Sequence, residues 1–247
     1  MNSARPIRLL LLVLLVVFIT MPEPFAPLFQ PLTENGAPAI YTQTSLLSLT
    51  LNHLFLVAGA MLASTLVSVG LAIFVTRPAG AEFLPLSRAL VNVGQTIPPV
   101  AVLALTVPMF GFGAVPTAIA LFLYGLLPIF ENTLAGLTGL PDSMIDAAKG
   151  VGMTGFQRLV SVELPLALPL ILTGVRISAV ISLATAAIGS TVAARTLGEV
   201  IIAGLLSNNT AFVLQGGIVI AGLALLLNDS LIALERHVTR HLRFVAG

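Results

Sequence analysis

Six long apolar runs constrain the fold of this chain more than any other feature. A helix needs about 20 predominantly apolar residues to cross the hydrocarbon core of a bilayer. Because backbone polar groups cannot stay unpaired in lipid, runs of this length predict helices. The sequence therefore predicts an all-α membrane protein with about six transmembrane helices in a single domain, residues 1–247. The predicted spans are 7–23, 54–76, 89–110, 116–134, 170–194 and 211–234.

The composition excludes several classes of function. Only 9% of the residues are charged and 57% are hydrophobic, whereas a soluble domain carries about 25% charged residues. The absence of Cys excludes disulfides, thiolate metal sites and Cys nucleophiles. No GxxxxGK(S/T) motif is present, so this chain cannot hydrolyse ATP itself. We therefore expect no enzyme activity, no cofactor or metal in this chain, and no nucleic-acid partner.

Basic residues are distributed unevenly between the two sides of a six-span arrangement. Nine of the 11 Lys and Arg residues fall on one side, and a single one, Arg195, falls on the other. Cytoplasmic segments of membrane proteins carry the excess of Lys and Arg. Both termini and the loop 135–169 are therefore predicted to be cytoplasmic. The nine residues are Arg5, Arg8, Arg77, Arg88, Lys149, Arg158, Arg236, Arg240 and Arg243.

The N-terminal run resembles a signal peptide, because Arg5 and Arg8 precede an apolar stretch. Residues 21–24 read Met-Pro-Glu-Pro and offer no small-residue cleavage site, so we expect an uncleaved first span. Residues 41–52 follow a Pro-rich stretch and are predicted to form a helix that lies on the membrane surface.

Several predicted spans contain uncharged polar residues that suit a polar pathway. Pro98 and Pro99 interrupt the third span, and such a break is tolerated only where other protein or a water cavity satisfies the freed carbonyls. Polar and small residues are also common in membrane helices as packing residues, so both interpretations stay open. The candidate path residues are Gln95, Thr96, Asn132, Ser182 and Thr185.

Two ionisable residues in or beside the spans have expected structural roles. Arg176 lies about two turns into the fifth span, where a charge is costly unless it is paired. We expect it to pair with Glu131 or Asp229, or to extend to the cytoplasmic surface, rather than to contact cargo. His53 begins the second span and is expected to anchor it at the outer interface.

The first half of the loop 135–169 carries the start and stop signals of a short helix. Ser143 and Asp146 fit an N-terminal capping pattern. Gly150 and Gly152 end the helix, and Gly152 lets the backbone turn where a side chain would obstruct it.

The second half of the loop predicts another short helix. Thr154 and Gln157 form a capping box that starts it, and Pro165 either ends it or opens the next span. Ala147 and Ala148 are small enough for another surface to approach closely. The two helices are expected to form a bent pair that projects into the cytosol and docks a water-soluble partner.

One series in this loop has a distinctive spacing. It runs Asp-Ala-Ala from residue 146, three residues, Gly152, nine residues, Val162, one residue, and then Leu-Pro from residue 164. The series resembles the EAA loop of permease subunits of bacterial ABC importers, E-A-A, three, G, nine, I, one, L-P, with only Asp for Glu and Val for Ile. The resemblance implies the type I ABC importer permease fold, with this loop as a coupling helix in a groove of an ATP-hydrolysing subunit. The implied coupling residues are Asp146, Ala147, Ala148, Gly152, Leu164 and Pro165.

Further segments are similar to the branch of this family that imports glycine betaine, proline betaine, choline and carnitine. The resemblance covers about residues 46–234 and implies an ATP-driven osmoprotectant importer. Arg195 departs from the small, Gly-rich dipeptide expected at this place and adds a positive charge at the outer face. The similar segments are 95–98, 121–124, 127–129, 132–133, 162–169 and 196–199.

The resemblance also implies an assembly in the bacterial cytoplasmic (inner) membrane. It comprises two ATP-binding subunits, a second permease that is the same or a related chain, and an extracytoplasmic substrate-binding protein. ATP binds the partner ATPase. Two alternatives stay open: an importer of another small solute, such as an amino acid or sulfonate, and an ion-coupled secondary transporter. The latter would usually carry an acidic residue deep in a span.

Overall fold

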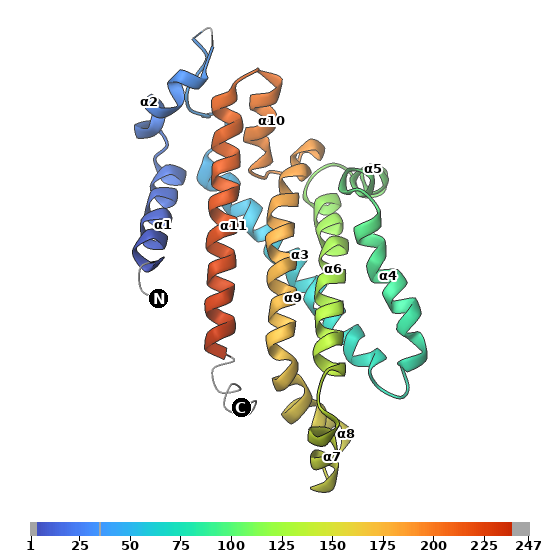
Figure 1. The fold of residues 1–247 in the computed structure, drawn as a ribbon. Helices are drawn as coiled ribbons and strands as arrows, with labels where there is room; N and C mark the ends of the chain where they lie inside the picture. Colours follow the sequence, from blue (N-terminus) through green and yellow to red (C-terminus); the bar gives the residue numbers. More distant parts are fainter. Residues whose placement is uncertain (1–3, 35, 239–247) are drawn as a thin grey trace. The chain divides into compact units, whose positions relative to one another are not determined.

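A computed structural model describes residues 4–34 and 36–238, and this part of the chain is helical between short connections, with no strand. The all-α prediction is confirmed. Arg240 and Arg243, which entered the charge comparison, lie outside the described residues. The elements are α1 Ala4–Thr20, η1 Glu23–Phe25, α2 Ala26–Phe29, η2 Gln30–Leu32, α3 Leu46–Val75, η3 Ala81–Phe83, α4 Leu84–Thr96, α5 Pro99–Phe110, α6 Ala114–Thr138, α7 Asp142–Gly150, α8 Gly155–Arg158, η4 Leu159–Glu163, α9 Leu164–Thr185, η5 Ala186–Val192, α10 Gly198–Leu206 and α11 Thr210–Val238 (Figure 1).

The chain groups into two compact units. Unit 1 comprises Met1–Ala60, Pro98–Leu121 and Val180–Asn228. Unit 2 comprises Met61–Ile97, Phe122–Ala179 and Asp229–Gly247. The helices α3, α6, α9 and α11 each contribute residues to both units.

Six spans are predicted, and the structure holds six candidates only if each bent pair of helices is counted as one span. Four continuous helical stretches qualify: α3, α6, residues 155–192 and α11. Two further pairs qualify together, the first helix with Glu23–Leu32, bent by 108°, and α4 with α5, bent by 97°. The described residues therefore hold four to six candidate spans. The predicted third span is broken between Thr96 and Pro99, where two prolines follow one another.

The predicted surface helix is wrong. No separate helix covers residues 41–52, because α3 begins at Leu46 and runs without a break for 30 residues. The predicted fifth span, 170–194, falls largely within a continuous helical stretch of residues 155–192, which tightens into 3₁₀ turns from Ala186 and stops at Val192.

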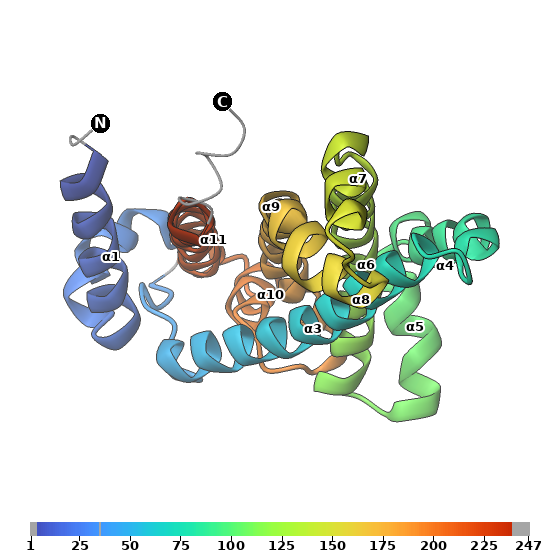
Figure 2. The same cartoon turned by 90° about the horizontal axis from the view of Figure 1, so that it is seen from below.

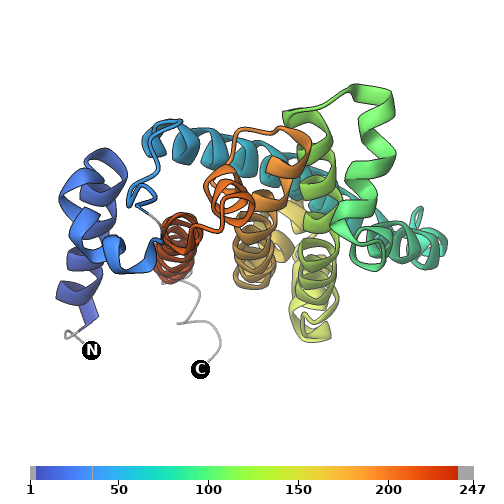
Figure 3. The ribbon, with the colours of Figure 1, turned by 90° about the horizontal axis from the view of Figure 1, so that it is seen from above.

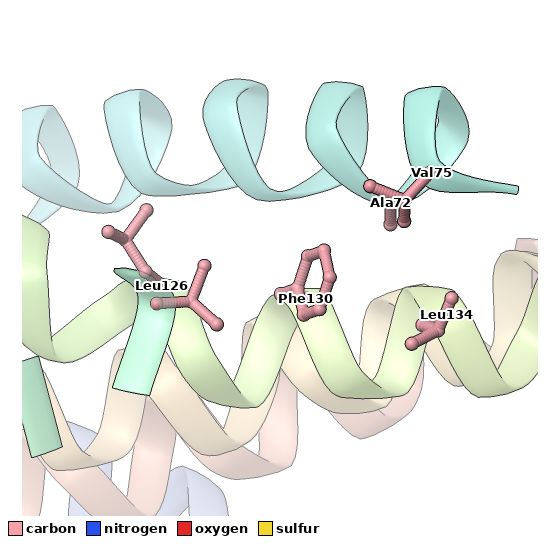
Figure 4. Close-up of a cluster of buried hydrophobic side chains, with 6 residues drawn as sticks. Ala72, Val75, Leu126, Phe130 and Leu134 are labelled. Carbon is pink, nitrogen blue, oxygen red and sulfur yellow. The ribbon is translucent and has the colours of Figure 1, made fainter. Parts of the chain in front are cut away.

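Unit 2 is held together by small and apolar residues between α3 and α6. Ala72 and Val75 of α3 face Phe130 of α6, with Leu126 and Leu134 on either side (Figure 4). Phe130 is fully buried. Dispersion contacts of this kind, rather than a hydrophobic effect between helices, hold helices together in lipid.

Buried serines join the same two helices by hydrogen bonds. Ser64 Oγ and Ser68 Oγ of α3 donate to the carbonyl oxygens of Phe122 and Leu126, each at 2.9 Å. Gly125 allows this approach, since a Cβ there would lie 2.6 Å from Ser64 Oγ. These serines are packing residues, as the second interpretation of the polar pattern predicts.

In unit 1, the segment before α3 is tied to the first turns of α11, as seen in Figure 3. Gln215 is fully buried, and its side chain donates to Ala39 O at 2.7 Å and accepts from Tyr41 N at 3.1 Å. Asn209 Nδ2 donates to Pro38 O at 2.9 Å. These bonds hold residues 38–41 against the start of α11.

His53 is an internal bridge and not an interfacial anchor, so that prediction is wrong. The residue is fully buried in unit 1. The backbone N–H of Leu197 donates to Nδ1 at 3.3 Å, and Nε2 lies 2.9 Å from Leu183 O. A ring nitrogen that accepts a hydrogen bond carries no proton, so Nε2 holds the hydrogen and donates to the carbonyl. The neutral imidazole thus joins α3 to α9 and to the start of α10.

Gly198, at the start of α10, makes the closest approach between elements of unit 1. A Cβ built on it would lie 1.8 Å from Ala187 O, a backbone atom of η5 that cannot simply move aside. Gly217 of α11 has nothing within 4 Å of such a Cβ.

We therefore expect Gly198→Ala to destabilise the purified chain by about 1 to 3 kcal/mol through overpacking, whereas Gly217→Ala is neutral or slightly stabilising. Thermal unfolding in detergent measures both. Equal unfolding midpoints for the two variants would contradict this packing.

Candidate functional site

The loop between α6 and α9 forms two helical segments, α7 and α8, beyond the ends of α6 and α9 in unit 2 (Figure 1). The first helix begins at Asp142 with Pro141 as its N-cap and no side-chain cap, so the predicted capping role of Ser143 is wrong. Ser143 already lies inside the first turn, where a proline-led start leaves it no cap position. The helix ends at Gly150, as predicted.

Gly152 reverses the chain between the two helices. Its φ is +80°, in the left-handed region that favours glycine, and its N–H donates to Lys149 O at 2.9 Å. The predicted capping box then starts α8: Gln157 N donates to Thr154 Oγ1 at 3.2 Å, and Thr154 N donates to Gln157 Oε1 at 2.9 Å. The turn between two helices and the capping box are confirmed, but α8 is not a separate short helix, since it continues through η4 into α9.

The outer surface of this pair is partly apolar. Asp146 and Ala147 are exposed, while Ala148 is buried within the chain and so lies on the inner side of α7. Val151 and Phe156 are each 75% exposed, next to the turn. Exposed large apolar side chains beside the turn are suited to contact with another protein. Their positions on either side of Gly152 are visible in the sequence, but neither residue is among the predicted coupling residues.

A buried carboxylate connects the loop to the rest of unit 2. Glu163 ends a single π-helical segment, η4, and is 4% exposed. Arg158 Nε donates to its Oε1 at 2.7 Å, and Arg77 Nη2, from the residues after α3, donates to its Oε2. Figure 2 shows α8 beside this end of α3. We call Arg77, Arg158 and Glu163 the carboxylate clamp.

The carboxylate clamp makes the loop rigid with respect to its surroundings in unit 2. Removing one partner of a buried, hydrogen-bonded ion pair is strongly destabilising, because the other charge stays buried. A π-segment within a helix is rare and frequently lies at a functional site. Leu164 and Pro165 follow it as the first residues of α9, both half-buried, so Pro165 opens the next span.

Three of the five candidate path residues lie in unit 2. Gln95 and Thr96 are exposed on the last turn of α4, and Asn132 is half-buried on α6. Gln95 Nε2 donates to Tyr124 O at 2.9 Å. That carbonyl lies four residues before Pro128, which has no N–H to offer it, so Gln95 replaces the missing helix bond. Asn132 Nδ2 donates to Pro128 O at 2.8 Å.

The other two, Ser182 and Thr185, lie in unit 1 on the last turns of α9. Ser182 is fully buried and Thr185 is half-buried. Four cavities in the described part of the chain are lined by other side chains.

Arg176 lies near an acidic residue that the prediction did not name, and Glu131, one of the predicted partners, is bound elsewhere. Its Nε lies 3.8 Å from Oε2 of Glu235 on α11, and both side chains are about a quarter exposed. Both carboxylate oxygens of Glu131 instead accept hydrogen bonds from Arg88 of α4, at 2.9 and 3.2 Å. The sequence offered three acidic residues near this end of the spans, and only the helix packing selects among them.

Known transport proteins are similar to this chain in sequence and fold. A family model described as "binding-protein-dependent transport system inner membrane component" matches residues 68–244. The chain belongs to this family. The osmoprotectant import permease protein OsmY of Salmonella typhimurium is 41% identical and covers 81% of this chain and 84% of the relative. The glycine betaine/carnitine/choline transport system permease protein OpuCB of Bacillus subtilis is 35% identical, covering 84% of this chain and 92% of the relative.

A chain of the MetNI methionine ABC transporter, solved in an inward-facing conformation, has the same fold. The two share 22% identity and a TM-score of 0.71, over 78% of this permease and 96% of that chain. The predicted type I ABC importer permease fold is confirmed. The family is one of membrane components, in agreement with the expectation that this permease is not itself the enzyme.

Proposed function

We propose that this permease is the transmembrane subunit of an ATP-driven importer of osmoprotectants such as glycine betaine, carnitine and choline. One observation carries the proposal. Relatives named for the transport of osmoprotectants or of these three solutes are 33% to 41% identical to it and cover at least 79% of its length. An importer of an amino acid or a sulfonate is the alternative that the experiment below separates.

In this proposal the whole chain is one permease domain in the bacterial cytoplasmic membrane, with both termini and α7–α8 in the cytoplasm. The excess of basic residues on that side supports this orientation. The assembly contains two ATP-binding subunits, a second permease that is the same or a related chain, and an extracytoplasmic binding protein. ATP is held by the ATP-binding subunits, as the lack of a phosphate-binding motif in this chain requires.

The bent pair α7–α8 is the coupling element, with Asp146 and Ala147 at its surface, Ala148 on its inner side and Gly152 at its turn. ATP brings the two ATPases together, their grooves carry the helix pair, and hydrolysis returns it. The carboxylate clamp supports this role, since a movement of α8 is transferred to the end of α3 and, through Leu164 and Pro165, to α9. Packed helices shift between discrete arrangements, so a small displacement at one end alters access to the path.

The path itself is proposed to involve Gln95, Thr96, Asn132, Ser182 and Thr185. Uncharged polar groups suit a zwitterion without net charge, because they solvate both ends weakly and let it leave. Gln95 uses its amide nitrogen for Tyr124 O, which leaves the side-chain oxygen for a solute.

Uptake by the assembled transporter tests the function. Proteoliposomes that contain the permease with its co-purified ATPase and binding protein are expected to accumulate radiolabelled glycine betaine in the presence of internal ATP. Unlabelled choline or carnitine should compete, whereas methionine and taurine should not. ATP-dependent uptake of taurine or an amino acid, without betaine uptake, would replace the proposal by the alternative.

Phe156 should anchor the ATPase. We expect Phe156→Ser to weaken the binding of the ATPase to the tagged permease, measured by co-purification, by about thirtyfold, since a central aromatic anchor is worth about 2 kcal/mol or more. Phe55→Ser is the matched control, because Phe55 of α3 is 74% exposed but lies far along the chain from the loop. If the control loses the ATPase equally, Phe156 is not the anchor.

Gly152 should be required for coupling. A valine there must adopt a positive φ, which costs about 1 to 3 kcal/mol, so the turn between α7 and α8 rearranges. We expect Gly152→Val to keep membrane insertion and ATP hydrolysis while betaine uptake per ATP falls. Gly150→Val, with no positive φ and nothing within 4 Å of its Cβ, is the control. Normal coupling in the Gly152 variant would count against the helix pair as coupling element.

A further inference from the structure

Unit 1 contains a cavity of about 700 Å³ that is lined by none of the proposed coupling or path residues. The segment before α3 forms one wall, α10 forms another, and the start of α11 forms the third. Under the proposed orientation these segments lie on the extracytoplasmic side. The described lining residues are Ala37, Pro38, Tyr41, Thr42, Gln43, Ser190, Glu199, Ile202, Ala203, Leu206, Ser207, Asn209 and Phe212.

Glu199 supplies the only formal charge among these residues. Its Oε1 accepts hydrogen bonds from Tyr41 Oη at 2.8 Å and Thr44 Oγ1 at 2.6 Å, so the carboxylate is held in one orientation. No Lys, Arg or His among the described residues lies within ion-pair distance of it, and Oε2 takes part in no hydrogen bond recorded for this part of the chain. A carboxylate so oriented, half-buried and without a counter-charge, leaves the cavity with a negative charge.

The rest of the lining selects the kind of cation. Tyr41 and Phe212 pack edge to face, with ring centroids 5.4 Å apart, and both are almost fully buried. Ile202, Ala203 and Leu206 add apolar surface. Burial raises the pKa of the Tyr41 phenol, and its hydrogen bond to Glu199 raises it further, so the hydroxyl keeps its proton and keeps the carboxylate in place.

A divalent metal does not fit this site. Calcium takes six to eight oxygen ligands, and magnesium needs octahedral geometry. Within residues 4–34 and 36–238, no group of three or more His, Asp or Glu side chains is placed to hold a metal. A quaternary ammonium group fits better, because its methyl groups need apolar and aromatic walls and its charge, which has no N–H to donate, needs only a nearby anion.

We propose that this cavity is a low-affinity binding site for the quaternary ammonium group of the transported solute, with Glu199 as its counter-charge. The proposal rests on the substrate class proposed above. The site would receive the solute after the binding protein releases it and before it enters the path. One carboxylate and two largely covered rings give weak binding, which a transit site needs if the solute is to move on.

The test uses the full permease–ATPase complex in nanodiscs, without binding protein, and measures equilibrium binding of radiolabelled choline. The neutral carbon isostere of choline, 3,3-dimethylbutan-1-ol, serves as competitor. We expect choline to bind in the wild type and the isostere to compete at least about tenfold more weakly, since it lacks the charge. Equal competition, or no choline binding at all, would overturn the proposal.

Glu199→Gln isolates the charge. The amide keeps an acceptor oxygen for Tyr41 and Thr44, so the unfolding midpoint should stay unchanged while choline affinity falls about tenfold and the preference over the isostere disappears. Glu82→Gln, which removes an exposed carboxylate before α4, is the matched control and should bind choline normally. Wild-type affinity in the Glu199 variant would overturn the proposal.

A second variant keeps the test valid if Glu199→Gln does not fold. Ala203→Phe fills the cavity from α10 without changing the carboxylate, and it should abolish choline binding. Retained binding would place the cation elsewhere. Failure of this site is distinguishable from failure of the proposed function, because betaine uptake by the wild-type transporter with binding protein is measured separately. If the wild type takes up betaine and the Glu199 and Ala203 variants bind choline as the wild type does, only the site is rejected.

Discussion

Where a proline interrupts a helix in the apolar part of this permease, the freed carbonyl needs another hydrogen-bond donor. Lipid offers no hydrogen bonds, so an unpaired carbonyl there costs several kcal/mol. This is about as much stability as a severely destabilising substitution removes. Pro128 leaves Tyr124 O without its helix donor, and Gln95 supplies one. The Tyr124 hydroxyl in turn donates to Ile97 O, at the break between α4 and α5. Tyr124 thus accepts one hydrogen bond at its carbonyl and donates another from its hydroxyl, and these two bonds satisfy the carbonyl that Pro128 leaves unpaired and the carbonyl at the break between α4 and α5.

The same need for hydrogen bonds accounts for three of the buried polar side chains of unit 1. His53, Gln215 and Asn209 each bridge two segments that are distant in sequence, and each does so through backbone atoms. Side chains that resemble interfacial anchors or pathway residues in the sequence therefore form hydrogen bonds between segments of the chain. A polar side chain in the proposed path can bind a solute only through donors and acceptors that are not already hydrogen-bonded to the backbone.

The loop between α6 and α9 obeys different physics, because its backbone can meet water. Its geometry comes from local devices: a capping box, a left-handed glycine and a short i,i+3 pair between Asp146 and Lys149 at 3.1 Å. The carboxylate clamp and the packing of Leu159 against Leu137, Ala167 and Ile171 reach beyond the loop. Under the proposed coupling role, the carboxylate clamp transfers a displacement of the loop to the end of α3.

The sequence by itself determined the helical class, the breaks at prolines, the turn at Gly152 and the cap at Thr154, because each depends on composition or on residues within a few positions of one another. The spacing of the loop also indicated the family. Only the tertiary structure decided that His53 is a buried bridge, that Arg176 meets Glu235 while Glu131 meets Arg88, and that Arg77 holds Glu163. These pairings join residues separated by tens of positions, and several partners of like charge were available to each. Which one is met depends on the rotation and offset of packed helices, and no local pattern encodes those.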